Sequence, residues 1–272
     1  MNFAIIGGDR RQLYLKEMLA QNRQNVNIFG FGETFSPAEI READYIILPM
    51  PASRNGKTVN APHSVEEISL LDIIKHANSA KKVFGGMLPT SFCELLDSRQ
   101  IPYFDYGRDE YLIILNAVLT AEAALKIAIE STDGALFGSR TLVIGNGRIG
   151  KILADYLNSL GSRVTVSARK DADFALIKSR GLAPANTGDI AKRISGFDYI
   201  FNTVPATVLG ENELKEVKSS AVIIDLASLP GGADKAVVNK FNINYIEALS
   251  LPGRISPEAA AKIIFDTVRA NM

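Results

Sequence analysis

Short apolar runs alternate with amphipathic stretches along almost all of the 272 residues of this chain. Parallel strands joined by crossover helices produce this pattern, because such strands are buried on both faces of their sheet. We expect strands in the first half at residues 3–6, 26–29, 45–48, 82–84 and 102–104, and in the second half at residues 141–144, 163–166, 199–203, 222–226 and 244–246. The pattern therefore predicts an α/β fold with two doubly wound parallel-sheet domains.

Three helices between or after these strands are predicted clearly. Residues 64–77 carry apolar side chains at helical spacing behind a capping Ser64. Residues 109–131 contain neither Gly nor Pro and stay apolar around much of the helix, which is typical of one long, buried helix. Residues 257–270 follow Ser256 as a cap. We expect this last helix to pack on the first domain.

The domain boundary is expected in or beside the long helix, since Asp133 and Gly134 break the pattern before a new strand starts. The predicted substrate domain is flavodoxin-like and covers residues 1–118 and 254–272. The predicted Rossmann dinucleotide-binding domain covers residues 119–253. The long helix joins the two.

Composition limits the partners of the protein. Thirty basic residues balance thirty acidic ones, so no net charge attracts nucleic acid or an anionic membrane. Cys93, His63 and His76 are the only cysteine and histidines, which argues against disulfides and a metal site. We expect no leader peptide and no apolar stretch long enough and free enough of charge to span a bilayer. A soluble, cytoplasmic protein with a small-molecule ligand is expected.

The most specific motif is a glycine fingerprint between the predicted strand at residues 141–144 and a helical stretch. Its first glycine permits a tight turn, its second allows a pyrophosphate to approach the backbone, and its third allows close packing of helix and sheet. In this context the motif predicts a bound dinucleotide, although a glycine-rich turn without ligand is the alternative. The predicted cofactor-binding residues here are Gly145, Asn146, Gly147, Arg148, Ile149 and Gly150.

The end of the next strand bears on which dinucleotide is bound. Ser167, Arg169 and Lys170 stand where NAD-specific domains usually place a carboxylate. NADP is therefore favoured over NAD as the cofactor. The alternative is that the two cations are solvated and neutralised by Asp171 and Asp173 nearby.

Two later segments follow strands of the same predicted sheet. Residues 202–205 (NTVP) follow the fourth strand, and residues 225–228 (DLAS) close the fifth. The predicted cofactor-binding residues among them are Thr203, Val204, Pro205, Ala227 and Ser228. Ligands of such sheets bind at the carboxyl ends of the strands, so we expect these residues to flank the nicotinamide ribose. A turn followed by a helix cap is the alternative for each segment.

The first domain offers two polar turns. Residues 7–11 (GGDRR) join a strand to a helix, so their backbone and either arginine could hold an anion. Residues 49–57 follow the third strand, in a position that often carries substrate. Both histidines precede the predicted Rossmann domain, so the late histidine base of 2-hydroxyacid dehydrogenases has no counterpart. Lys, Asp, Glu and Tyr remain as acid and base candidates.

Seven segments form a further pattern, in order along nearly the whole chain: GGDRRQ at residues 7–12, LPMP at 48–51, FGGM at 84–87, NAVLTAE at 116–122, the fingerprint, DLASLPGG at 225–232 and LPGR at 251–254. Together they resemble the A-type subunit of dipicolinate synthase, a spore-associated family. The resemblance implies a Rossmann domain inserted into a substrate domain. It also implies NADP-linked oxidation, with dehydration, of 4-hydroxy-tetrahydrodipicolinate to dipicolinate, with the flavoprotein-like B-type subunit of that enzyme as partner.

A dicarboxylate substrate requires cations to balance it, and the domain that would bind it supplies arginines. We assign candidate catalytic roles to Arg54, Arg108 and Glu122, and candidate substrate contacts to Arg10, Met50, Ser53, Asn116 and Thr120. A homo-oligomer is expected. Two other interpretations stay open: a shikimate, alanine or methylene-tetrahydrofolate dehydrogenase-like enzyme, and a cofactor-binding regulatory subunit without turnover of its own.

Overall fold

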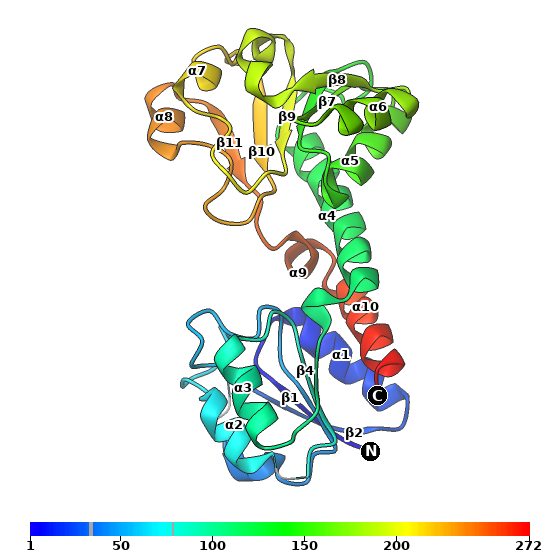
Figure 1. The fold of residues 1–272 in the computed structure, drawn as a ribbon, viewed down its shortest axis with the longest axis vertical. Helices are drawn as coiled ribbons and strands as arrows, with labels where there is room; N and C mark the ends of the chain where they lie inside the picture. Colours follow the sequence, from blue (N-terminus) through cyan, green and yellow to red (C-terminus); the bar gives the residue numbers. More distant parts are fainter. Residues whose placement is uncertain (33–34, 78) are drawn as a thin grey trace. The chain divides into compact units, whose positions relative to one another are not determined.

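The computed structural model describes residues 1–32, 35–77 and 79–272, and the chain divides into two compact units (Figure 1). Unit 1 comprises Met1–Asn116 and Pro252–Met272, and unit 2 comprises Ala117–Leu251. Each unit is built on its own parallel sheet. The predicted α/β class with two doubly wound domains is confirmed.

Unit 1 contains a five-stranded sheet in the order β2-β1-β3-β4-β5, which is the order of flavodoxin-like folds. Every strand bound lies within one residue of the sequence prediction. The strands are β1 (Asn2–Ile6), β2 (Asn25–Phe29), β3 (Tyr45–Ile47), β4 (Lys82–Gly85) and β5 (Tyr103–Asp105).

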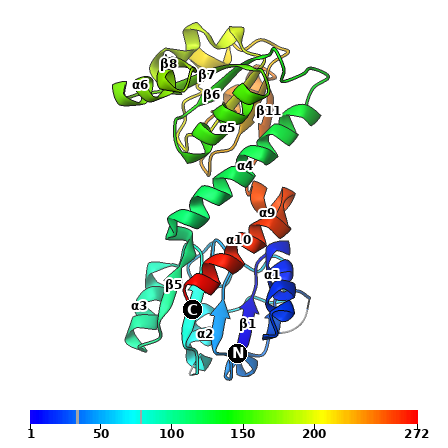
Figure 2. The same ribbon diagram turned by 90° about the vertical axis from the view of Figure 1, so that its right-hand side faces the viewer.

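Helices cover both faces of this sheet. On one face α1 (Arg10–Gln21) packs against α10 (Pro257–Ala270), which has the bounds predicted for it (Figure 2). The other face carries α2 (Leu70–His76) and α3 (Thr90–Ser98). Short segments complete the unit: the 3-10 turns η1 (Pro37–Ile40) and η2 (Tyr106–Arg108), and α9 (Leu251–Ile255), whose first residue belongs to unit 2.

The prediction of a helix over residues 64–77 was wrong in its first half. The helix α2 begins at Leu70, and Ser69 rather than Ser64 caps it. The residues before it pair with an earlier loop, where the Val59 amide donates to the Ile68 carbonyl at 2.8 Å. Those backbone bonds come from a distant segment, so helical spacing alone did not reveal them.

Unit 2 contains a six-stranded sheet in the order β11-β10-β9-β6-β7-β8, which is the order of the dinucleotide-binding Rossmann fold. The prediction missed only β8, an edge strand that contains Pro184 and no β-branched residue. The strands are β6 (Arg140–Ile144), β7 (Arg163–Ala168), β8 (Ala183–Asn186), β9 (Tyr199–Asn202), β10 (Val222–Asp225) and β11 (Asn244–Glu247).

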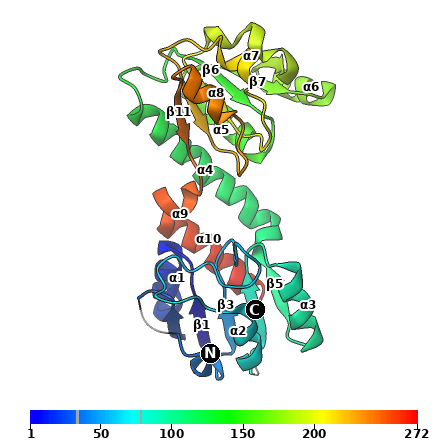
Figure 3. The same ribbon diagram turned by 90° about the vertical axis from the view of Figure 1, so that its left-hand side faces the viewer.

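The strand order in unit 2 reverses between β6 and β9, so right-handed crossovers place the later helices on the opposite face of the sheet. Helices α5 (Arg148–Ser159) and α6 (Asp171–Ser179) lie on one face, and α7 (Glu211–Leu214) and α8 (Lys235–Lys240) on the other, which faces the viewer in Figure 3. The 3-10 turns η3 (Thr187–Lys192) and η4 (Ile194–Gly196) connect β8 to β9. This reversal is where ligands of such sheets bind.

Helix α4 (Glu110–Glu130) is the predicted long helix, and the division between the units falls within it. By length and composition alone it is long and apolar enough to cross a membrane, with a mean hydropathy of 1.9. The expectation that no stretch of the chain meets these criteria was therefore wrong. Within that window 44% of the residues are buried inside the structure, and core helices of soluble proteins meet the same criteria.

Candidate functional site

The turn between β6 and α5 combines two crowded glycines with an open one. Gly145 has a φ of +104°, and a Cβ there would lie 2.5 Å from the Thr203 hydroxyl. A Cβ on Gly150 would lie 2.1 Å from the Gly145 carbonyl oxygen. In contrast, a Cβ on Gly147 would meet no atom within 4 Å, and Gly147 is the N-cap of α5. No side chain caps this helix, and its first turn contains no acidic residue.

The open N-terminus of α5 has the properties of a phosphate site. Its first backbone amides lack helical acceptors, and the helix dipole adds positive potential there. Asn146 donates from Nδ2 to Asp173 Oδ1 at 3.0 Å, while its buried Oδ1 has no hydrogen-bond partner among the described residues. That oxygen is free to accept a bond from a ligand hydroxyl. The residues present therefore fit a dinucleotide, with its pyrophosphate on the α5 amides.

At the end of β7 two cationic side chains are exposed, whereas the hydroxyl group of Ser167 is buried. Arg169 and Lys170 are both exposed. Ser167 is fully buried, and its hydroxyl accepts a hydrogen bond from Thr187 at 3.2 Å. Asp173 lies in the first turn of α6, only a few residues further on. Of the predicted residues at this strand end, the two cations are thus the ones available to a ligand.

The ends of β9 and β10 lie beside the fingerprint turn. Thr203 donates from its hydroxyl to the Ile144 carbonyl at 2.9 Å and packs against Gly145. The two residues after Thr203 are progressively more exposed, Val204 being half-buried and Pro205 exposed. Ala227 is buried, whereas Ser228 is exposed. The structure thus brings the fingerprint and the predicted segment at residues 203–205 into contact.

Three polar residues of this region were given no role from the sequence, although Asn202 and Asp225 stand in the two segments expected at this site. Asn202 and Asp225 are the last residues of β9 and β10, both fully buried, and Tyr245 on β11 donates to Asp225. Asn202 and Asp225 lie opposite each other in the strand register, and Asn202 Nδ2 donates to Asp225 Oδ1 at 2.8 Å. Polar residues that end two apolar buried strands are the signal that could have identified them.

In the corresponding turn of unit 1, between β1 and α1, side chains of the turn itself bind the N-terminus of the helix. Asp9 caps α1 and binds Arg11 through two nitrogens, with Nε–Oδ1 and Nη2–Oδ2 distances of 2.8 Å each. Arg11 also donates to the Met50 carbonyl at 2.9 Å and is only 8% exposed. Burial alone would raise the pKa of Asp9, but the hydrogen bond and charge of Arg11 hold that pKa below its ordinary value. Arg11 is therefore committed inside the protein, which corrects the expectation that either arginine could hold an anion.

Two exposed arginines that were predicted to bind substrate line separate grooves of unit 1. Arg10 lines a groove of about 600 Å³ with residues of α1 and α10. Arg54 lines another, of about 420 Å³, and donates from Nε to Asn60 Oδ1 at 3.1 Å. Within unit 1 the structure does not bring these two guanidinium groups into one groove.

Three further predicted residues of unit 1 follow the strands β3 and β5. Met50 packs against Gly86, where a Cβ would lie 2.4 Å from it. Ser53 accepts a bond from the Gly56 amide at 2.9 Å, which shapes its loop. Arg108 is exposed, with Nε 3.4 Å from Asp105.

Three predicted residues lie on α4. Asn116 and Thr120 are half-buried and one helical turn apart, and Glu122 is exposed. Four residues of spacing place the first two on the same side of the helix. Asn116 belongs to unit 1, and the other two belong to unit 2.

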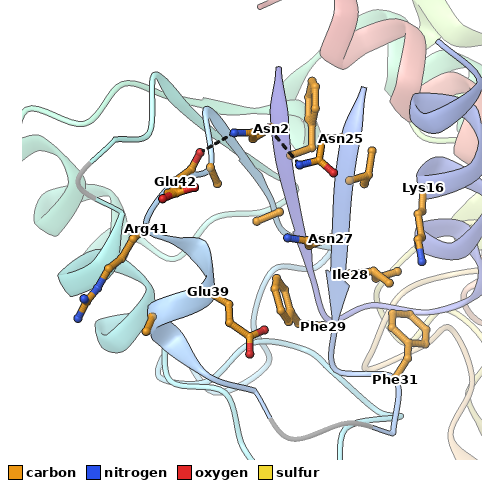
Figure 4. A pocket seen from close by; sticks show the side chains of 15 residues that line it. Asn2, Lys16, Asn25, Asn27, Ile28, Phe29, Phe31, Glu39, Arg41 and Glu42 are labelled. Atoms are coloured by element: carbon orange, nitrogen blue, oxygen red, sulfur yellow. Dashed lines mark hydrogen bonds between the residues drawn. The ribbon is translucent and has the colours of Figure 1, made fainter. Parts of the chain in front are cut away.

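A groove of about 730 Å³ runs along the edge strand β2 and beside η1 (Figure 4). Its lining is mixed in charge, with Lys16, Arg41 and Glu42 among the residues, and an amide contact joins Asn25 Nδ2 to Asn2 Oδ1 at 3.2 Å. No residue of the predicted site lines it. The groove therefore stands apart from the turns described above.

Comparison with known proteins agrees with the division into units. Residues 2–107 match the family model for the N-terminal domain of the dipicolinate synthase A-type subunit. Residues 124–244 match the family model for the NAD binding domain of D-isomer specific 2-hydroxyacid dehydrogenases. Together with the Rossmann strand order and the open α5 N-terminus, these matches define a nicotinamide dinucleotide-binding oxidoreductase of the dehydrogenase type.

The similarity extends over the whole chain. The dipicolinate synthase A-type subunit of Bacillus subtilis (strain 168) is 29% identical over 97% of this chain and 93% of that protein. The crystal structure of the corresponding subunit from Bacillus halodurans matches with a TM-score of 0.85 at 28% identity, over 99% and 97% of the two chains. The resemblance to this subunit of dipicolinate synthase is thus confirmed. D-lactate dehydrogenase from Escherichia coli, with a TM-score of 0.64 and 14% identity over 99% and 95% of the chains, shares the fold alone.

Proposed function

We propose that this protein acts as the A-type subunit of a dipicolinate synthase in the cytoplasm of a sporulating cell. In this proposal it oxidises 4-hydroxy-tetrahydrodipicolinate, with loss of water, to dipicolinate. The observation that carries the proposal is the uncapped, acid-free N-terminus of α5 at the fingerprint turn, in a chain that resembles this subunit from end to end. We also propose that it forms a homo-oligomer and works with a flavoprotein-like partner, the B-type subunit of the enzyme.

In this reaction the protein itself does not need to form covalent bonds to the substrate. Water leaves the partly reduced ring, and a hydride and a proton then leave as the ring becomes aromatic. The bound nicotinamide would accept the hydride, and the protein would orient the ring and balance its two carboxylates. We assign unit 1 as the substrate domain and unit 2 as the cofactor domain.

The side chains proposed for the substrate are those that carry charge or line its expected surroundings. Arg54 and Arg108 would balance carboxylates, and Glu122 would handle a proton. The other proposed contacts are Arg10, Met50, Ser53, Asn116 and Thr120. The exposure of Arg54 and Arg108 supports this assignment, because exposed guanidinium groups are available to a ligand.

The decisive experiment measures NADP reduction by the purified protein with freshly prepared 4-hydroxy-tetrahydrodipicolinate, both with and without the flavoprotein-like partner. We expect reduced nicotinamide to appear together with dipicolinate. A folded protein that binds neither NADP nor NAD at millimolar concentration would contradict the oxidoreductase proposal. Binding without turnover, even with the partner present, would instead favour a regulatory cofactor-binding subunit.

We further propose that NADP is preferred to NAD, since Arg169 and Lys170 are exposed at the end of β7. Calorimetric titration of both cofactors tests this preference directly. Arg169→Ala should weaken NADP binding by about tenfold, the loss expected for one charge-assisted contact with a phosphate, and leave NAD binding unchanged. Equal losses for both cofactors would show that Arg169 does not read the 2'-phosphate.

Arg54 gives a test of the substrate side. Arg54→Ala should raise KM for the dicarboxylate by roughly tenfold or more, because one charged contact is lost, while the dinucleotide Kd stays the same. Lys57→Ala is the matched control, since Lys57 is an exposed cation of the same loop with no proposed role. An unchanged KM for the Arg54 variant would remove Arg54 from the site.

A second candidate function is a dehydrogenase of another small carboxylic acid. The match of residues 124–244 to the 2-hydroxyacid dehydrogenase domain favours it. Both histidines of the chain, His63 and His76, lie in unit 1, which speaks against the late histidine base of those enzymes. The same assay, with small 2-hydroxy acids as substrates, separates the two candidates.

A further inference from the structure

A buried carboxylate stands at the carboxyl end of β10. Asp225 is 1% exposed and accepts hydrogen bonds from four groups. Asn202 Nδ2 and the Ala227 amide donate to Oδ1 at 2.8 and 3.1 Å. The Gly232 amide and the Tyr245 hydroxyl donate to Oδ2 at 2.7 and 2.5 Å. Each carboxylate oxygen of Asp225 thus accepts two hydrogen bonds.

The partners of Asp225 favour the charged form of its carboxylate, because all four donate hydrogen bonds to it. Two of these partners are backbone amides and one is a side-chain amide, and amide nitrogens can only donate. Burial raises the pKa of Tyr245, and its bond to Asp225 raises that pKa further, so the phenol stays protonated and donates. Within the described residues of unit 2, Asp225 forms no salt bridge. A negative charge is therefore buried there without a cation.

The chain folds closely around this charge. A Cβ on Gly232 would lie 1.9 Å from Asn202 Nδ2, and one on Gly231, whose φ is +88°, would lie 3.1 Å from Asp225 Oδ2. The loop that contains Ala227 and Ser228 is thus anchored on the carboxylate. Because the Asp225 carboxylate is fixed and buried, solvent screens its electric field less than that of a surface charge.

The position of Asp225 gives this charge a role toward the cofactor. In folds with this strand order, the half of the sheet formed here by β9, β10 and β11 faces the nicotinamide half of the dinucleotide. The nicotinamide ring is positively charged when oxidised and neutral when reduced. We propose that Asp225 makes unit 2 bind the oxidised cofactor more tightly than the reduced one. This inference rests on the proposed dinucleotide binding and adds a preference between its two redox states.

Binding measurements test the inference without any turnover. The Kd values for NADP⁺ and NADPH are measured by calorimetry for the wild-type protein and for Asp225→Asn. We expect the wild type to bind NADP⁺ more tightly than NADPH. The variant should raise the ratio of the oxidised to the reduced Kd by about tenfold, as expected for loss of one unit charge at the effective dielectric constant of protein interiors. A ratio that stays within about twofold of wild type would overturn the proposal.

Two control variants separate charge from structure. Tyr245→Phe removes one donor and keeps the charge, so the ratio should not change even if both affinities fall. Asp198→Asn removes a carboxylate at the opposite end of β9, where it pairs with Lys218, and should also leave the ratio unchanged. A shift in the ratio for either control would show that the effect is not specific to the Asp225 charge.

The wild-type protein alone decides the matter if Asp225→Asn does not fold. Tighter binding of NADPH than of NADP⁺, or equal binding, overturns the proposal. Binding of neither form also overturns it, and in that case the proposed function fails as well. Binding of both forms with the wrong preference leaves the proposed function standing and rejects only the role of Asp225.

Discussion

In each unit a glycine-rich turn leads from the first strand of the sheet into the first helix, but the N-terminus of that helix is capped differently in the two units. In unit 1, Asp9 is the N-cap of α1, and its carboxylate binds both the helix amide of Arg11 and the guanidinium group of that residue. In unit 2 the N-cap of α5 is Gly147, and no side chain caps the helix. One helix N-terminus already has a negative group, and the other is open.

This difference shows that glycine content does not by itself make a phosphate site. Helix N-termini attract negative charge, and a carboxylate of the chain satisfies that attraction as well as a ligand does. The residue at the N-cap therefore distinguishes a turn that stabilises the fold from one that is available to bind. Three experiments test this comparison.

The largest effect is expected from Asp9→Ala. The variant removes the cap of α1 and leaves the nearly buried guanidinium of Arg11 without its carboxylate, so unit 1 should lose about 3 kcal/mol of stability. Hydrogen exchange of the amides in β1 and α1 measures this loss for unit 1 alone. Asp266→Ala, which breaks the exposed pair with Lys262, should cost less than about 1 kcal/mol. Dinucleotide binding should be unchanged in both variants.

The next largest effect is expected from Gly147→Asp, which gives unit 2 the capping arrangement of unit 1. A side chain fits there, because a Cβ on Gly147 would meet no atom within 4 Å. The new carboxylate should cap α5, and it should weaken dinucleotide binding by about 100-fold by occupying and repelling the phosphate position.

A charge-matched control accompanies this variant. Gly134→Asp adds the same charge in an exposed turn before β6, where a Cβ meets only ordinary contacts. Its dinucleotide Kd should remain that of wild type. If Gly147→Asp also binds as wild type does, the α5 amides do not hold the phosphates and the comparison between the two turns fails.

The smallest effect concerns the pH dependence of unit 1. Because the folded-state pKa of Asp9 lies below its ordinary value of 3.8, its contribution to stability is present above that pH. The contribution should be lost as the pH falls from 3.8 through the lower folded-state pKa. The difference in unfolding free energy between wild type and Asp9→Asn should therefore shrink in acid. A constant difference across that range would mean that the Arg11 pairing does not lower the pKa of Asp9.

Local patterns in the sequence predicted most of the sheets and the fingerprint turn. Ten of the eleven strands were predicted from short runs rich in apolar residues, including the edge strands β2, β5 and β11. Only β8 was missed, because this edge strand contains neither a β-branched nor an aromatic residue. The role of Gly145 to Gly150 also follows from nearby residues, because a strand, a turn and a helix are contiguous in the chain.

Contacts between distant segments were not predictable in the same way. The residues before α2 carry helical spacing, yet pairing with the loop at residues 57–59 excludes a helix there. The cluster of Asn202, Asp225 and Tyr245 joins three strands, and only their register brings the three side chains together. The sequence likewise allowed either Arg10 or Arg11 to hold an anion, and the burial of Arg11 beside Asp9 and Met50 distinguished them.

The sequence alone determined the α/β class, the dinucleotide turn and the resemblance to dipicolinate synthase, because each depends on residues that are neighbours in the chain or on short segments in a fixed order. The tertiary structure decided which helix N-terminus is open, which arginine is buried and where a carboxylate lies without a cation. These properties depend on burial and on pairing across the sheet. Both arise only when strands and loops that are far apart in the sequence come together.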